Sequence, residues 1–418
     1  ICFFSFETQA FLNGANAIDL IGQYTQNDGV TPDYVGSSQN DVPGMYGLNH
    51  PSGNALDAIN HRLFISDSDN NRVLVFNLNV SNQLVDRTPD YVLGQTSFVT
   101  KTVSTTQSGM NTPSGLAYDS VNNRLFVADS SSNRVLVYDV ASITNGENAV
   151  AVLGQIDFVN SSAATTQAGM SNPTRLAYDT VNQRVFVVDN SNSRVTAYNA
   201  TSTIINGANA VAVLGQTNFT SSGSDTTQST MSYPVDIAYD NTNQRLFVAD
   251  SSNNRVTVYN ATSTIINGAN AINVLGQTNF TNFGFAATQA GMALPSGLTY
   301  DSLNQRLFVS DSGNNRVTVY NATSTMINGA SATKVLGQTN FTNYSAATTQ
   351  SRMDEPLSLS YDTVSQQLFL ADRGNNRVTV YNATSTIING SNAIDLIGQY
   401  TQNDGVTPSY TTGNADDN

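Results

Sequence analysis

The chain has 418 residues, a formal net charge of −14 and only 11% charged side chains. Its 17 basic residues are too few to neutralise a run of phosphates, which argues against nucleic acid as a partner. A single cysteine excludes a disulfide framework, and no apolar run approaches the roughly 20 residues of a membrane-spanning helix.

The first 34 residues form an extension that starts with an apolar run, ICFFSF, at residues 1–6. Residues 13–34 return almost unchanged at residues 389–410, with 20 of 22 positions identical. Both copies contain an apolar core followed by Gly-Gln, which has the pattern of a short strand. The residues of the two cores are Asp19, Leu20, Ile21, Gly22, Gln23, Tyr24 and Asp395, Leu396, Ile397, Gly398, Gln399, Tyr400.

Between the two copies lies a repeat with a period of 60–62 residues, which an internal comparison reveals before any other feature. Its most regular member is an arginine, at Arg72, Arg134, Arg194, Arg255, Arg316 and Arg377. An aspartate stands five residues before each arginine, another stands fifteen before, and a proline stands twenty-one before. The two sets of aspartates are Asp67, Asp129, Asp189, Asp250, Asp311, Asp372 and Asp57, Asp119, Asp179, Asp240, Asp301, Asp362.

Each repeat predicts four short antiparallel strands, as the fourth repeat illustrates. Strands are expected over residues 234–240, 245–249, 255–259 and 271–275, because apolar and polar residues alternate between turn-forming clusters. The longer loop before the last strand carries Asn267-Gly268, a dipeptide typical of hairpin turns. Four short strands at this period are typical of a propeller blade.

The segment from Pro113 to Tyr138, PSGLAYD followed by RLFVADSSSNRVLVY, resembles the NHL repeat. The resemblance extends over all six units, residues 51–399, and implies a β-propeller in which the first strand of each blade is innermost. We therefore predict an all-β fold: a six-bladed propeller of four-stranded antiparallel blades at residues 35–399, with strand-forming extensions at residues 1–34 and 400–418. The family includes lyases, strictosidine-synthase-like enzymes, ligand-sensing domains and protein- or RNA-binding platforms, so the fold does not settle the function.

The two sets of aspartates begin turns, and we predict that their side chains cap the backbone amides that follow. A calcium site in one or two of these loops is the alternative; no other cofactor or metal is predicted. The repeated arginines are expected to pair with the aspartates five residues before them. One methionine in each linker is expected to plug the space between neighbouring blades, at Met110, Met170, Met231, Met292 and Met353.

No catalytic residue is predicted. The only histidines are His50 and His61, whereas propeller lyases related to NHL proteins use several histidines around a metal. Asn-x-Ser/Thr sequons recur at equivalent places that should be exposed, which makes N-glycosylation an expectation if the cell of origin performs it. These are Asn199, Asn260, Asn321, Asn382 and Asn218, Asn279, Asn340.

Seven outer-strand patterns serve only six blades, so one is surplus. Three explanations stay open: a recent duplication without a role, closure of the ring by the N-terminal copy with displacement of the C-terminal one, or a slice from a longer tandem protein. In the second case the displaced strand can enter the equivalent groove of another molecule.

Few lysines, abundant Asn, Ser and Thr and an acidic balance favour an extracellular or cell-surface setting. The leading hypothesis is a non-catalytic structural protein that assembles with itself, including into filaments, by exchanging its near-identical terminal segments. The alternative is a monomeric binding module for a carbohydrate, peptide or small ligand, with the first repeat as the place to search. A propeller lyase or hydrolase ranks third.

Overall fold

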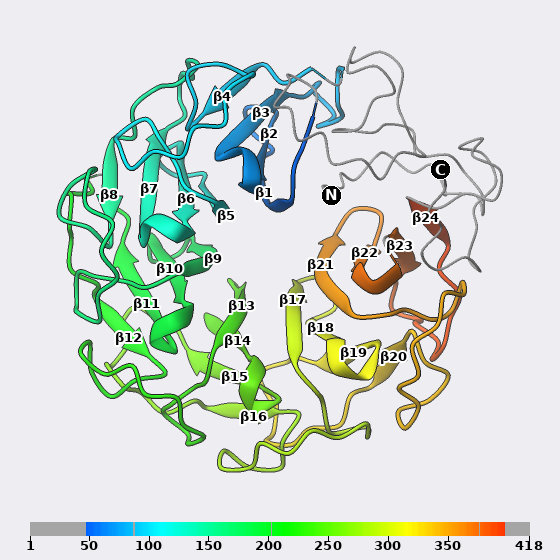
Figure 1. The fold of residues 1–418 in the computed structure, drawn as a ribbon. Helices are drawn as coiled ribbons and strands as arrows, with labels where there is room; N and C mark the ends of the chain where they lie inside the picture. Colours follow the sequence, from blue (N-terminus) through cyan, green and yellow to red (C-terminus); the bar gives the residue numbers. More distant parts are fainter. Residues whose placement is uncertain (1–46, 87, 202, 376, 398–418) are drawn as a thin grey trace.

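The computed structural model describes residues 47–397 except 87, 202 and 376. These residues form six blades around a central axis, and each blade is a four-stranded antiparallel sheet (Figure 1). The six-bladed, all-β propeller expected from the repeat is therefore confirmed. The first strand of each blade lies nearest the axis, and the order within a blade follows the chain from the inside outward.

The strands repeat with nearly constant lengths of seven, six, six and three residues. Blade 1 consists of β1 (Pro51–Asp57), β2 (Arg62–Asp67), β3 (Arg72–Asn77) and β4 (Tyr91–Leu93). Blades 2 and 3 consist of β5 (Pro113–Asp119), β6 (Arg124–Asp129), β7 (Arg134–Asp139), β8 (Ala151–Leu153), β9 (Pro173–Asp179), β10 (Arg184–Asp189), β11 (Arg194–Asn199) and β12 (Ala212–Leu214). Blades 4 and 5 consist of β13 (Pro234–Asp240), β14 (Arg245–Asp250), β15 (Arg255–Asn260), β16 (Asn273–Leu275), β17 (Pro295–Asp301), β18 (Arg306–Asp311), β19 (Arg316–Asn321) and β20 (Lys334–Leu336). Blade 6 consists of β21 (Pro356–Asp362), β22 (Gln367–Asp372), β23 (Arg377–Asn382) and β24 (Asp395–Ile397).

The outermost strand is shorter than the sequence pattern suggests. In blade 4 the expected strand at 271–275 is reduced to Asn273–Leu275, which pairs with β15. Ala271 instead exchanges hydrogen bonds with Gln228 in the preceding linker: the Ala271 N–H donates to the Gln228 carbonyl, and the Gln228 side chain donates to the Ala271 carbonyl. The linker thus binds Ala271, whereas the Ile272 N–H still donates to the Val258 carbonyl of β15.

One-turn 3₁₀ helices connect the second and third strands of every blade. They are η1 (Ser68–Asn70), η2 (Ser130–Ser132), η3 (Asn190–Asn192), η4 (Ser251–Asn253), η5 (Ser312–Asn314) and η6 (Arg373–Asn375). In the first five blades the residue after the helix has a left-handed backbone, as Asn254 does with φ 52°. Asparagine tolerates this conformation better than most residues, which explains the Asn-Arg of blades 1, 2, 4 and 5; blade 3 has Ser193 at this point.

At the five junctions from blades 1 and 2 to blades 5 and 6, apolar side chains of neighbouring blades pack on one another. One cluster joins Phe247, Val256 and Val258 of blade 4 to Leu307 and Val309 of blade 5, and similar clusters join the other pairs of consecutive blades. The linker methionines lie in these clusters with no exposed surface, so their predicted role as plugs between blades is confirmed.

Candidate functional site

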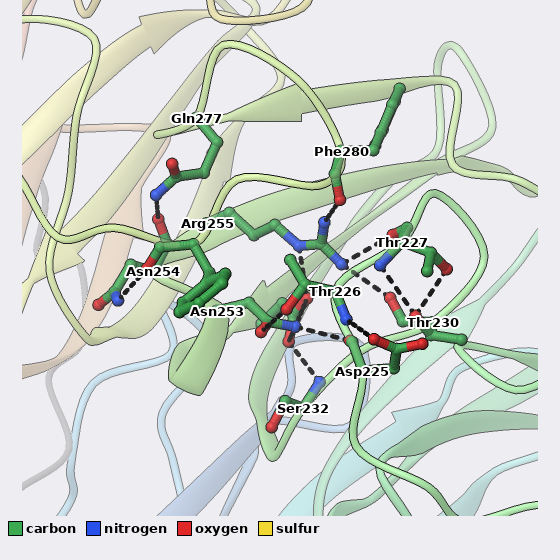
Figure 2. Close-up of polar contacts among 12 residues, drawn as sticks. Asp225, Thr226, Thr227, Thr230, Ser232, Asn253, Asn254, Arg255, Gln277 and Phe280 are labelled. Carbon is green, nitrogen blue, oxygen red and sulfur yellow. Dashed lines mark hydrogen bonds and ion pairs between the residues drawn. The ribbon is translucent and has the colours of Figure 1, made fainter.

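The six repeated arginines form buried ion pairs with the aspartates five residues before them, as the sequence predicts. Figure 2 shows one of them, Arg255, whose Nε lies 2.6 Å from the Asp250 Oδ2. Its other nitrogens donate to the carbonyl oxygens of Phe280, Thr227 and Thr230 in the two adjoining linkers. Both side chains have no exposed surface, so these "linker-face pairs" are structural clamps. They are Asp67–Arg72, Asp129–Arg134, Asp189–Arg194, Asp250–Arg255, Asp311–Arg316 and Asp372–Arg377.

The capping role predicted for these aspartates is wrong for the linker-face set. The Asp250 Oδ1 accepts the backbone N–H of Ser232, eighteen residues upstream, and not an amide of the following helix. The carboxylate is turned toward the linker because the arginine and Asn253 occupy its other oxygen. At the other end of the blade the prediction is confirmed, since the Asp240 Oδ1 accepts the N–H groups of Thr242 and Asn243.

A second set of arginines escaped the sequence analysis. Arg245 pairs with Asp240 at 2.7 Å and also donates to the Ala322 carbonyl of the next blade. Because the same contact recurs at five successive blades, these "hairpin-face pairs" join each blade to the next. They are Asp57–Arg62, Asp119–Arg124, Asp179–Arg184, Asp240–Arg245 and Asp301–Arg306. An arginine five residues after the earlier aspartate in each of the first five repeats was the signal that could have revealed them.

The two sets differ in their titration. Burial raises the pKa of the Asp129 carboxyl to about 6, although Arg134 and hydrogen bonds oppose this shift. Burial also acts to raise the pKa of Asp240, but hydrogen bonds from Asn243 and Arg245 outweigh it and leave the pKa below its ordinary value. Asp57 and Asp179 behave like Asp240.

We expect the propeller to be most stable near pH 4, close to the ordinary carboxyl pKa of 3.8 at which the contributions of both sets are present. A raised folded-state pKa, as at Asp129, gives stability that is lost as the pH rises through about 6. A lowered pKa, as at Asp240, gives stability that is lost as the pH falls below the ordinary value of 3.8. Denaturation midpoints measured from pH 7.5 to pH 2.5 test this. In Asp240→Asn, the loss of stability at acid pH should be smaller than in the unmodified protein. A steady fall in stability from pH 7 downward would contradict it.

The histidines do not form one site. The His50 side chain is 79% exposed and its Nδ1 lies 3.5 Å from the Asp69 Oδ2, whereas the His61 Nδ1 lies 2.7 Å from the Asn82 Oδ1. They lie at opposite ends of β1, and a seven-residue strand spans about 20 Å. His61 has a φ of 56° and occupies the left-handed turn position that Asn or Gln fills in the other blades.

The inner wall of the ring carries one departure from the repeat that has chemical consequences. The third residue of the innermost strand is glycine in blades 1, 2 and 5 but Arg175 in β9 and Asp236 in β13. The Arg175 Nε lies 3.8 Å from the Asp236 Oδ1, with 27% and 15% of the two side chains exposed. Asp236 also accepts the N–H of Leu298 from the next inner strand.

Glycine is required at the equivalent positions because the inner strands approach closely there. A Cβ on Gly115 would lie 2.6 Å from the Thr174 carbonyl oxygen, and one on Gly297 would lie 2.3 Å from that of Leu357. At the equivalent position, blade 3 has the positively charged Arg175 and blade 4 has the negatively charged Asp236. Burial raises the pKa of Asp236, while Arg175 opposes this shift. The sequence analysis missed this pair, although a comparison of the residues after each repeat proline would have found it.

The predicted sequons of the repeat lie at exposed positions. Asn199, Asn260, Asn321 and Asn382 are the last residues of third strands, and Asn218, Asn279 and Asn340 lie in the linkers; all seven are exposed. A change of mass after treatment with a peptide N-glycosidase tests whether the native protein carries glycans there.

Of the two near-identical terminal segments, the structure describes part of the C-terminal one. Asp395, Leu396 and Ile397 form β24, which pairs with β23 as the fourth strand of blade 6. The explanation in which the N-terminal copy completes that blade is therefore wrong. The C-terminal copy follows β23 through the loop at residues 383–394, which occupies the same place as the loop between the third and fourth strands of the other blades. Asp19, Leu20, Ile21, Gly22, Gln23, Tyr24, Gly398, Gln399 and Tyr400 lie outside the described residues.

Within residues 47–397, apart from the three positions left out, no cluster of three or more His, Cys, Asp or Glu is placed to hold a metal ion. The same part of the chain contains no helix long and apolar enough to cross a membrane. Comparison with protein families matches the NHL repeat at residues 110–138 and 231–259, in blades 2 and 4. Each match runs from the linker methionine to the residue before the last one of the third strand. No curated protein matches the chain significantly.

Proposed function

Because this chain is an NHL-repeat β-propeller, we propose that it is a non-catalytic binding module whose ligand contacts the inner wall of the ring at Arg175 and Asp236. The observation that carries this proposal is the charged pair itself. It replaces the close glycine contact of blades 1, 2 and 5, and it leaves part of a guanidinium and part of a carboxylate accessible beside the axis. A peptide or a small polar ligand that bears both charges fits this arrangement.

The use of the other charged groups supports a binding role over a catalytic one. The carboxylates of both repeated sets are hydrogen-bonded within the fold, and their arginines donate to backbone carbonyls of linkers or of the next blade. A carboxylate fixed in this way has little freedom to take up and release protons during a reaction. A propeller lyase or hydrolase therefore remains the least favoured of the three hypotheses.

We expect Arg175→Gln and Asp236→Asn each to weaken ligand binding by about tenfold to a hundredfold, the effect of losing one charged hydrogen bond. The protein is first screened against a short-peptide display library and a glycan array, and the binders are then measured against each variant. Arg373→Gln is the matched control, because Arg373 has a 65% exposed side chain in a helix of blade 6. Equal binding by all three variants would show that the ligand does not bind at Arg175 and Asp236.

Self-assembly at the cell surface or outside the cell is the second candidate function, and one observation favours it. The C-terminal copy already occupies the outer position of blade 6, so all six described blades have their fourth strand and the near-identical N-terminal sequence is surplus to them. A strand without a partner in its own molecule can pair with a second molecule, and head-to-tail contacts of this kind form filaments when they do not close.

Deletion of residues 1–34 is expected to convert such assemblies into monomers. Light scattering coupled to size exclusion measures the mass, and negative-stain electron microscopy shows whether fibres persist. Deletion of residues 401–418 is the control, because it leaves every described strand in place, whereas deletion of 389–418 would remove β24 and damage blade 6. A full-length protein that is monomeric at all concentrations would end this hypothesis.

A further inference from the structure

The six junctions between blades are not equivalent. Inner strands of neighbouring blades pack on one another at five junctions, from β1 with β5 to β17 with β21, but no comparable contact joins β21 to β1 in the described residues. Figure 1 shows the same difference, since β21 and β1 stand farther apart than the other neighbouring inner strands. The described ring is therefore open between blade 6 and blade 1.

The residues that join blades elsewhere are replaced at this junction. The hairpin-face arginine, which donates to the next blade, becomes Gln367 in blade 6, and its Oε1 is buried without a hydrogen-bond partner. On the facing side, the inner-strand tyrosine that stacks on the phenylalanine of the preceding blade becomes Leu56 in blade 1. Neither blade 6 nor blade 1 thus has the residue that makes these contacts at the other junctions.

Both apolar faces of the open junction are nevertheless buried. Blade 1 presents Leu63, Ile65, Leu74 and Phe76, each 1% exposed, in a cluster that contains no residue of blade 6. Blade 6 presents Phe369, Val378 and Val380, which are 0–5% exposed, in a separate cluster with no residue of blade 1. Two faces that are buried but do not touch need a third element between them.

The first residues of the chain have the sequence of such an element. Aligned without gaps at the Asn-Gly dipeptides, residues 1–6 correspond to β15 and residues 19–21 correspond to β16. Cys2 and Phe4 take the places of Val256 and Val258, the two residues of β15 that pack against the next blade. Residues 1–21 therefore carry third-strand and fourth-strand sequence, in the order required directly before blade 1.

We propose that residues 1–21 of the same chain form a partial seventh blade that fills the junction between blade 6 and blade 1. Cys2 and Phe4 then contact the face of blade 1 that contains Ile65 and Leu74. The ring closes through an element that buries apolar surface on both of its sides, which explains the burial of both clusters. This proposal does not depend on the binding site at Arg175 and Asp236.

The single cysteine makes the test unambiguous. Ile65→Cys and Leu74→Cys place a second thiol on the blade 1 face, and Val187→Cys places one at the position equivalent to Ile65 in blade 3, where blade 2 already fills the junction. After mild oxidation of the full chain, we expect an intrachain disulfide between Cys2 and at least one of the two blade 1 cysteines, and none with Val187→Cys. In the unmodified protein, Cys2 should react with a maleimide at least tenfold more slowly than a cysteine introduced at the 85% exposed Val80 in a Cys2→Ser background.

Three results would overturn the proposal. A disulfide between two chains would show that a second copy fills the junction, which is the strand exchange of the assembly hypothesis. A Cys2 that reacts as fast as the exposed control would show that the segment is not packed. A slowly reacting Cys2 that links to neither blade 1 position would place the segment elsewhere.

Discussion

Replacing Asp250 by asparagine is expected to lower the free energy of unfolding by about 3–5 kcal/mol. Arg255 has no exposed surface, so the variant leaves a buried guanidinium without its counter-charge. Removing one partner of a buried pair is costly because neither water nor another charge can replace it. Since the chain contains no tryptophan, the unfolding midpoint in guanidinium chloride is best followed by far-ultraviolet circular dichroism.

Asp225→Asn is the matched control for this prediction. Asp225 is exposed in the linker that approaches the same clamp, and its backbone carbonyl keeps its bond from Asn253 in the variant. The control should change the stability by no more than about 0.5 kcal/mol. The double variant Asp250→Leu with Arg255→Met should recover much of the loss, because an apolar pair leaves no unpaired charge. A loss below about 1 kcal/mol in Asp250→Asn would contradict the clamp as described.

Replacing Gly276 by alanine is expected to lower the free energy of unfolding by about 2–4 kcal/mol, from backbone strain and overpacking together. Gly276 has a φ of +85°, and an added Cβ would lie 2.3 Å from the Cγ of Met292. The methionine cannot retreat easily, because it is fully buried between blades 4 and 5. The measurement is the same guanidinium unfolding curve.

The linker itself supplies the control for Gly276→Ala. Gly284 lies eight residues later, with no heavy atom within 4 Å of an added Cβ, so Gly284→Ala should be neutral within about 0.5 kcal/mol. Met292→Ala alone should cost about 2–5 kcal/mol, since it opens a cavity. If the alanine clashes with the methionine, the double variant costs less than the sum of the single variants. If the costs of the two single variants simply add, the loss of stability in Gly276→Ala comes from backbone strain alone.

The repeat explains why so much of the fold could be predicted from the sequence. Strand positions, turns and the linker-face pairs follow from residues close together in the chain, such as Asp250 and Arg255. The pattern occurs six times, and each repeat supports the assignment made in the others. The methionine plugs could also be foreseen, because an apolar residue at a fixed place in each polar linker has only the adjoining blades to pack against.

Contacts between blades could not be read in the same way. The Arg245 guanidinium meets a carbonyl oxygen 77 residues away, and Arg175 meets Asp236 across 61 residues, distances over which a sequence pattern specifies no geometry. The direction of the Asp250 carboxylate was misjudged for the same reason, since its partner Ser232 belongs to the preceding linker.

The sequence by itself determined the number of blades, their strand order and the near-identity of the two ends, because these properties depend on local periodicity. Only the tertiary structure decided that the C-terminal copy completes blade 6, that two opposite charges meet on the inner wall, and that the junction between blades 6 and 1 differs from the others. These outcomes depend on which surfaces face one another when the ring curves, and packing in three dimensions selects them among several pairings that the sequence alone allows.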